Sequence, residues 1–362
     1  MMPRITRRVA ATILITAVAS VAIHGRSLIA SDDVVALSGE PLPGASTALR
    51  TQSTALDRIG KRQPALDSTM WRAGTGRGIT IYIFDGGITT GHPELDGRVR
   101  AGYNAFPENP RACNSHGAAV AGAAAGATLG VAPEANVVDV KIIDCARMRG
   151  SSGAILAAAQ WTAADHAMHP DQPAVANWSF VVDTVRSVAE VDSAVAILER
   201  AGILVVAAAG NFDMNACHAS PANAPGTLVV GASAVVQTTD GRWRDVRVPN
   251  TAWGECVDLF APGRSVLLPA FDGRQPITAK WSGTSMAAGF VSGAAALILE
   301  RNPTATPKQV MDAILRQATP AVADTRLGIR THAPLLYIGP TVLYASCGMR
   351  DVGRVSSRGG CM

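Results

Sequence analysis

The sequence predicts a three-layer α/β domain with a mostly parallel central sheet. Apolar runs rich in β-branched residues, typical of strands buried on both faces, occur at 79–84, 136–143, 173–178 and 203–209. Helix-like segments at 151–166 and 185–200 lie between these runs. Strands that alternate with helices form βαβ units, which place neighbouring strands parallel to each other.

The composition indicates one large folded domain. The chain has 362 residues, of which 48% are hydrophobic and 17% are charged, and its net charge is +4. This balance excludes a disordered chain. Basic residues are scattered and only 5% of the residues are aromatic, so we expect no nucleic-acid partner. Six cysteines without a Cys-x-x-Cys pair favour an oxidising compartment over a zinc or redox site.

Residues 1–30 are typical of an export signal. Arginines precede an apolar run over 9–23, which is short for a membrane span. The segment fits either a cleaved signal peptide or a retained anchor. We expect a short linker at 31–50, the main domain at 51–338 and a C-terminal tail at 339–362. The expected location is secreted or in the cell envelope.

The most informative stretch is 282–289, which reads Ser-Gly-Thr-Ser-Met-Ala-Ala-Gly and leads into an apolar helix up to Glu300. A helix that is apolar on all sides is expected to be buried. Ser285 lies in its first turn, where the positive end of the helix dipole favours the negative charge that develops on a serine nucleophile. A serine that only caps the helix is the alternative interpretation of this stretch alone.

Three further polar residues stand at the ends of predicted elements. Asp85 follows the strand at 79–84, Asn211 follows the strand at 203–209, and His116 begins a helix of small residues. In open α/β sheets, functional sites lie at the carboxyl ends of the strands. Each residue taken alone would more simply be structural, so the argument depends on their combination.

The order Asp85, His116, Asn211, Ser285 and the Gly-Thr-Ser-Met-Ala motif resemble the subtilisin-like (subtilase) serine proteases, in particular the proteinase K and aqualysin-like branch. The resemblance covers about 56–337. It implies a subtilisin-like fold and a serine endopeptidase that acts on protein or peptide substrates. Ser285 would be the nucleophile, His116 the base, Asp85 the carboxylate that orients it, and Asn211 the oxyanion donor. Residues 31–50 would then be a linker or the remnant of a propeptide.

The resemblance also implies two disulfides, Cys113–Cys145 and Cys217–Cys256, and two walls of a substrate groove. The residues expected in the groove are Ser179, Phe180, Val181, Arg147, Arg149, Ala209 and Gly210. Val181 and the two arginines stand where the family has glycines. We therefore expect a narrowed groove that favours an acidic residue some positions before the cleaved bond. The alternative is that both arginines point to solvent and the loop bends away from the groove.

Other departures from the family leave two rival functions open. Gly86, Ala118 and Ala119 replace residues that support the catalytic groups in the family. One rival is a catalytically impaired pseudoprotease that binds peptides or a partner, and the other is an envelope protein anchored by residues 9–23. An aspartate that helps to bind a structural calcium in the family is Ala234 here, so we expect no cofactor and no metal. We expect a monomer, with at most a transient membrane anchor through the signal segment.

Overall fold

The computed structural model describes residues 12–14, 49–182, 188–320, 322 and 333–339. Within these ranges the largest sheet has eight strands. Its order is β11 (Trp243–Arg247), β10 (Thr227–Gln237), β9 (Leu204–Ala208), β8 (Ala174–Trp178), β4 (Thr80–Asp85), β6 (Asn136–Lys141) and β5 (Val99–Asn104), with β12 (Leu259–Pro262) paired to β10. Among these pairs only β10–β11 is antiparallel, so the predicted mostly parallel sheet is confirmed.

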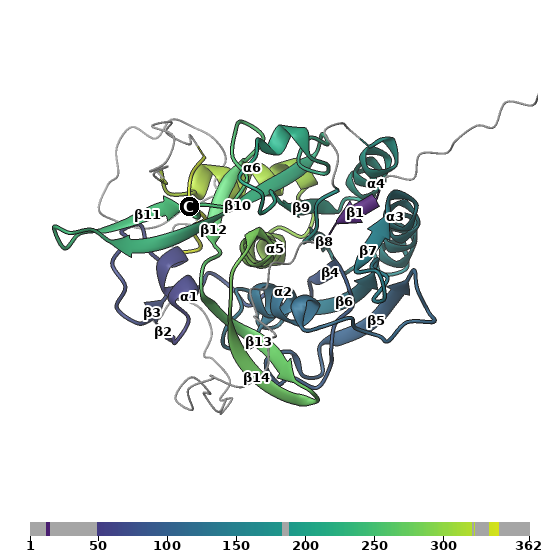
Figure 1. Cartoon of the computed structure of the whole chain (residues 1–362), viewed down its shortest axis with the longest axis horizontal. Helices are drawn as coiled ribbons and strands as arrows, with labels where there is room; N and C mark the ends of the chain where they lie inside the picture. The colour runs from purple at the N-terminus through teal and green to yellow at the C-terminus, as the bar shows by residue number, and fades with distance from the viewer. Residues whose placement is uncertain (1–11, 15–48, 183–187, 321, 323–332, 340–362) are drawn as a thin grey trace, which may run out of the picture.

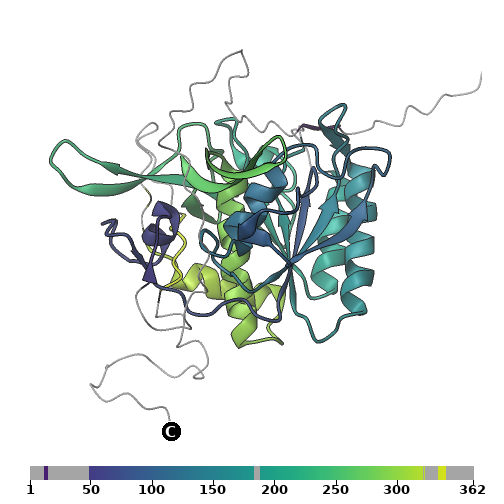
Figure 2. The same ribbon diagram turned by 90° about the horizontal axis from the view of Figure 1, so that it is seen from below.

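Helices cover both faces of this sheet, which gives the predicted three layers (Figures 1 and 2). One face packs against α3 (Ser152–Ala167) and α4 (Ala189–Arg200), and the other against α2 (His116–Ala125), α5 (Thr284–Arg301) and α6 (Pro307–Gln317). The side chains of β4 alternate between the two cores: Ile81 and Ile83 belong to one, Tyr82 and Phe84 to the other. This period of two explains why the strand is apolar along its whole length.

Smaller elements surround the three layers. They are β1 (Thr12–Leu14), β2 (Leu49–Arg50), α1 (Thr54–Ile59), β3 (Thr69–Met70), η1 (Pro93–Leu95), β7 (Arg149–Ser151), η2 (Ala216–His218), β13 (Val266–Asp272) and β14 (Gln275–Trp281). β13 and β14 form an antiparallel hairpin, and β1 pairs antiparallel with β7. Of the predicted export signal the structure describes only Thr12–Leu14; the C-terminal tail beyond Gly339 lies outside the described residues. No helix in the described part of the chain has the length and apolar character needed to cross a membrane.

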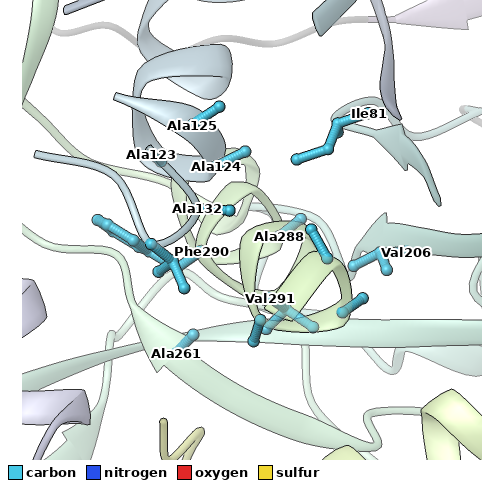
Figure 3. Close-up of a cluster of buried hydrophobic side chains, with 14 of the residues drawn as sticks. Ile81, Ala123, Ala124, Ala125, Ala132, Val206, Ala261, Ala288, Phe290 and Val291 are labelled. Atoms are coloured by element: carbon cyan, nitrogen blue, oxygen red, sulfur yellow. The ribbon is translucent and has the colours of Figure 1, made fainter. Parts of the chain in front are cut away.

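The centre of the molecule is α5, whose residues from Thr284 to Leu297 are all buried. Figure 3 shows part of its environment, with Ala123 and Ala124 of α2 on one side and Val206 of β9 on the other. Two glycines of α5 allow α2 to approach closely. A Cβ on Gly289 would lie 2.8 Å from the Val120 carbonyl oxygen, and one on Gly293 would lie 2.5 Å from that of Ala124. Both contacts have the same spacing along the two chains, so the helices lie parallel in a fixed register.

Candidate active site

The carboxyl end of β4 and the first residue of α2 meet in a buried ion pair. Asp85 Oδ2 lies 2.8 Å from His116 Nδ1, and both side chains are buried. The Gly86 N–H donates to Asp85 Oδ1 at 2.6 Å, and the His116 N–H donates to Asn114 Oδ1 at 2.8 Å. These bonds fix the carboxylate and the start of the helix, so that Nδ1 faces Asp85 and Nε2 faces away from it.

The environment of His116 moves its pKa in two opposing directions. Burial lowers the pKa, while the charge of Asp85 and its hydrogen bond raise it, and the net pKa lies above the usual value for histidine. The imidazolium is therefore stabilised by Asp85, as a base that carries a proton for part of a reaction cycle requires.

Ser285 lies in the first turn of α5 and is hydrogen-bonded to Ser179, the residue that follows β8. Its Oγ donates to the Ser179 carbonyl oxygen at 3.4 Å, and Ser179 Oγ lies 3.2 Å from the Ser285 carbonyl oxygen. Ser179 Oγ donates to Asn177 Oδ1 at 2.7 Å, and Asn177 Nδ2 donates to Ser292 Oγ at 3.0 Å. This hydrogen-bonded chain through the buried residues Asn177 and Ser292 was not expected from the sequence, because small polar residues inside strands and helices carry no motif.

Asn211 is oriented by the start of α5. Its Oδ1 accepts from the Thr284 N–H at 2.9 Å and from Thr284 Oγ1 at 3.2 Å, so the amide nitrogen points elsewhere. A Cβ added to Gly283 would lie 3.4 Å from Asn211 Nδ2. The Ser285 N–H belongs to the first turn of a helix, where backbone donors lack a partner within the helix. The Asn211 amide and the Ser285 N–H are thus both located at the start of α5.

The groove residues expected from the sequence divide between core and surface. Phe180 packs into the core, stacked on Trp178 with ring centroids 5.4 Å apart, while Ala209 is buried beside Gly210. The Val182 N–H donates to the Ser220 carbonyl oxygen at 2.7 Å. Val181 is 7% exposed, and its Cγ2 lies 3.3 Å from where a Cβ of Gly210 would stand.

The other expected wall contains β7. Arg147 is exposed and its Nη1 lies 2.6 Å from Asp144 Oδ2, so its charge already has an intramolecular partner. Arg149 is also exposed and lies within β7, opposite Leu14 of β1.

The structure contains both disulfides that the resemblance implied, Cys113–Cys145 and Cys217–Cys256. The first connects the loop before His116 to the loop before β7. Lys141, which is buried, places Nζ 2.8 Å from Cys145 Sγ. A Cβ on Gly86 would lie 3.4 Å from Cys113 Cβ, so the disulfide packs beside Gly86, one of the positions that depart from the family.

Trp281 contacts His116, and Ala234 lines a cavity. The Trp281 ring meets the His116 ring edge-on, with centroids 6.3 Å apart, a contact that its place before the serine motif did not reveal. Ala234 offers no side-chain oxygen ligand, and the cavity of about 350 Å³ that it lines is also lined by the cationic residues Arg58 and Arg264. These residues do not fit a calcium ion. Among the residues that the structure describes, no group of three or more His, Cys, Asp or Glu could hold a metal.

Comparisons with known proteins agree with this architecture. The chain is 39% identical over 280 residues to an extracellular serine proteinase of Thermus sp. (strain Rt41A), covering 76% of this chain and 64% of that protein. It is 35% identical over 320 residues to alkaline serine exoprotease A of Vibrio alginolyticus, covering 88% of this chain and 55% of that protein. The chain thus spans less than two thirds of these relatives' lengths.

A solved structure shows the same fold. The crystal structure of a cold adapted subtilisin-like serine proteinase superposes with a TM-score of 0.67 at 35% sequence identity, covering 79% of this chain and 97% of that one. The model of the subtilase family matches residues 76–332, which include Asp85, His116, Asn211 and Ser285. The chain therefore belongs to the subtilase family.

Proposed function

We propose that this chain is a serine endopeptidase in which Ser285, His116 and Asp85 form the catalytic triad. The observation that carries the proposal is the register of α2 and α5. Gly289 lies against Val120 and Gly293 against Ala124. The same register, carried back one helical turn, would set Ser285 opposite His116, which supports the proposal. The Asp85 carboxylate holds Nδ1 at 2.8 Å, which leaves Nε2 for the serine hydroxyl.

The proposed reaction follows from these positions. Ser285 Oγ attacks the peptide carbonyl carbon and its proton passes to His116 Nε2, while Asp85 stabilises the resulting imidazolium. The oxyanion is bound by Asn211 Nδ2 and the Ser285 N–H. Collapse of the intermediate expels the amine, which takes the proton from His116, and water then hydrolyses the acyl-enzyme. No step uses a metal or a cofactor.

The substrate is proposed to bind as an added strand on the edge of β7. The antiparallel register of β1 on β7, with Ile13 opposite Gly150, supports this because it uses the backbone groups that a peptide would use. Arg149 would then lie beside the peptide, which keeps the expected preference for an acidic residue with this side chain.

A secreted or envelope location is proposed from three observations. One relative is named an extracellular proteinase, the structure has two disulfides, and the sequence begins with an export-like segment. We further propose a monomer. No nucleic-acid partner is proposed, because the basic residues do not cluster in the sequence. A membrane role for the signal segment would be transient.

Labelling with a fluorophosphonate probe tests the catalytic proposal. The parent should be labelled at Ser285, and Ser285→Ala, folded by circular dichroism, should be neither labelled nor active. His116→Ala should lose nearly as much turnover, because members of a triad act as a unit. A folded parent that is not labelled would favour the rival function of a pseudoprotease that only binds peptides.

A further inference from the structure

Two neighbouring segments of the chain flank Ser285 and Asn211, and the proposed function places the attacked residue of the substrate beside them. Residues 179–182 continue β8 and residues 209–211 continue β9, and these strands are parallel neighbours with Trp178 opposite Ala207. The attacked carbonyl must reach both Ser285 Oγ and Asn211 Nδ2. The side chain of the residue that carries this carbonyl therefore enters between the two segments.

Val181 stands in this space. The register of β8 and β9, continued beyond Trp178, sets Val181 opposite Gly210. Val181 Cγ2 lies 3.3 Å from the position of a Gly210 Cβ, Phe212 Cδ2 lies 3.5 Å from it, and Ala252 Cβ lies 3.9 Å from it. Three apolar side chains thus converge on one point next to the oxyanion donor.

The neighbours of Val181 hold it in place. Phe180 is fixed by its stack on Trp178, and Val182 is fixed by its backbone bond to Ser220 and by burial in the core. A β-branched side chain on a fixed backbone has few rotamers, so Val181 cannot easily swing aside. Its low exposed fraction of 7% results from contact with the opposite segment.

Resting on the proposed function, we propose that Val181, with Phe212 beside it, closes the side-chain pocket at the residue that precedes the cleaved bond. The chain then accepts glycine or alanine at this position and excludes aromatic and long aliphatic side chains. Its substrates are segments rich in small residues.

A series of fluorogenic peptides that differ only at this position tests the proposal by kcat/KM. The parent should prefer alanine over phenylalanine by at least ten-fold. Val181→Gly should reduce or reverse this ratio, and Val181→Ala should give an intermediate value. Val246→Ala, at a similarly buried valine of β11, is the matched control and should leave the ratio unchanged. A parent that prefers phenylalanine, or the same ratio in Val181→Gly, would overturn the proposal.

Product binding tests the pocket without any turnover. Calorimetry on Ser285→Ala should show peptides that end in alanine binding at least ten-fold more tightly than peptides that end in phenylalanine. Adding Val181→Gly should remove the difference. Equal binding of both peptides, or of neither, would overturn the closed pocket. Absence of fluorophosphonate labelling in the parent, with the alanine preference in binding retained, would instead count against the proposed catalysis alone.

Discussion

The two ends of the Asn211 amide have different partners, and this separates its structural role from its chemical one. Oδ1 is held by the Thr284 N–H, while Nδ2 is the group proposed to meet the oxyanion. A substitution that keeps the acceptor but removes the donor can therefore isolate the chemistry.

Asn211→Asp is that substitution. The carboxylate still accepts from Thr284 but cannot donate, and it adds negative charge where the oxyanion forms. We expect kcat to fall by about 10²–10³, or about 3 kcal/mol, as for an oxyanion-hole asparagine in subtilisin, with little loss of stability. Asn211→Ala, which removes both roles, should lose as much kcat and some stability in addition. A fully active Asp variant would contradict the assignment.

The raised pKa of His116 predicts the acid limb of the pH profile. The base must be neutral, so activity falls as the pH drops through a pKa that lies above the ordinary value of about 6.5. In Asp85→Asn the charge of Asp85 is lost while the burial remains, so the limb should move to lower pH and kcat should drop by about 10⁴. Measurement of kcat/KM against pH tests both expectations. An acid limb of the parent enzyme at or below pH 6.5 would be inconsistent with the buried ion pair.

At the level of elements, α2 and α5 carry the base and the nucleophile, so their separation sets the geometry of the site. Gly289 permits the contact: an added Cβ would lie 2.8 Å from the Val120 carbonyl oxygen and 2.9 Å from Ala123 Cβ. Neither neighbour is the end of a flexible side chain, so the helices would have to move apart.

Gly289→Ala should therefore destabilise the fold by about 1–3 kcal/mol and lower kcat at the same time. Gly153→Ala in α3 is the matched control, since its Cβ would meet only Ser151 Oγ at 4.0 Å. That variant should gain about 0.5–1 kcal/mol because alanine restricts the unfolded chain, with kcat unchanged. Urea unfolding and turnover are measured on both; a Gly289 variant as stable as the control would refute the close-contact argument.

Helices and strands with a regular apolar pattern in the sequence were predictable, while elements that depend on contacts between distant residues were not. The buried strands and helices of the βαβ units follow from apolar periodicity and fall close to the predicted ranges. The β13–β14 hairpin does not follow from periodicity, because Pro269 and Pro276 argue against strands. Asp272-Gly273 is nevertheless a hairpin turn signal. Pro269 packs on Gly122 of α2, a contact that no local sequence pattern contains.

In the site, too, residues within sequence motifs were predictable, while contacts that depend on the packing of distant segments were not. Asp85, His116, Asn211 and Ser285 could be picked out because each stands at the end of an element within a recognisable motif. The contact of Val181 with the Gly210 position depends on the register of two parallel strands, and the burial of Phe180 depends on Trp178. Strand register is a tertiary property, so the sequence indicated a narrowed groove without indicating which side chain closes it.

For the whole molecule, two disulfides join cysteines that are 32 and 39 positions apart in the sequence, respectively. Each is expected to contribute about 2–4 kcal/mol, mainly by restricting the unfolded chain. The paired variants Cys113→Ala/Cys145→Ala and Cys217→Ala/Cys256→Ala should each lower the free energy of unfolding by this amount. Peptide mapping of exported protein without reduction should recover both pairs; free thiols at these four positions would disprove the cross-links.

The position of α5 also has a consequence for how the chain folds. The helix that fills the middle of one core comes from residues 284–301, after every strand of the central sheet has been made. Its contacts are far apart in sequence, and parallel sheets with such contacts form slowly. Until α5 docks, the apolar face of α2 and the sheet stays uncovered, which favours aggregation. Docking of α5 therefore covers the core and brings Ser285 to the site in the same folding step. Chains that end before Thr284 should be insoluble and unable to cleave peptides.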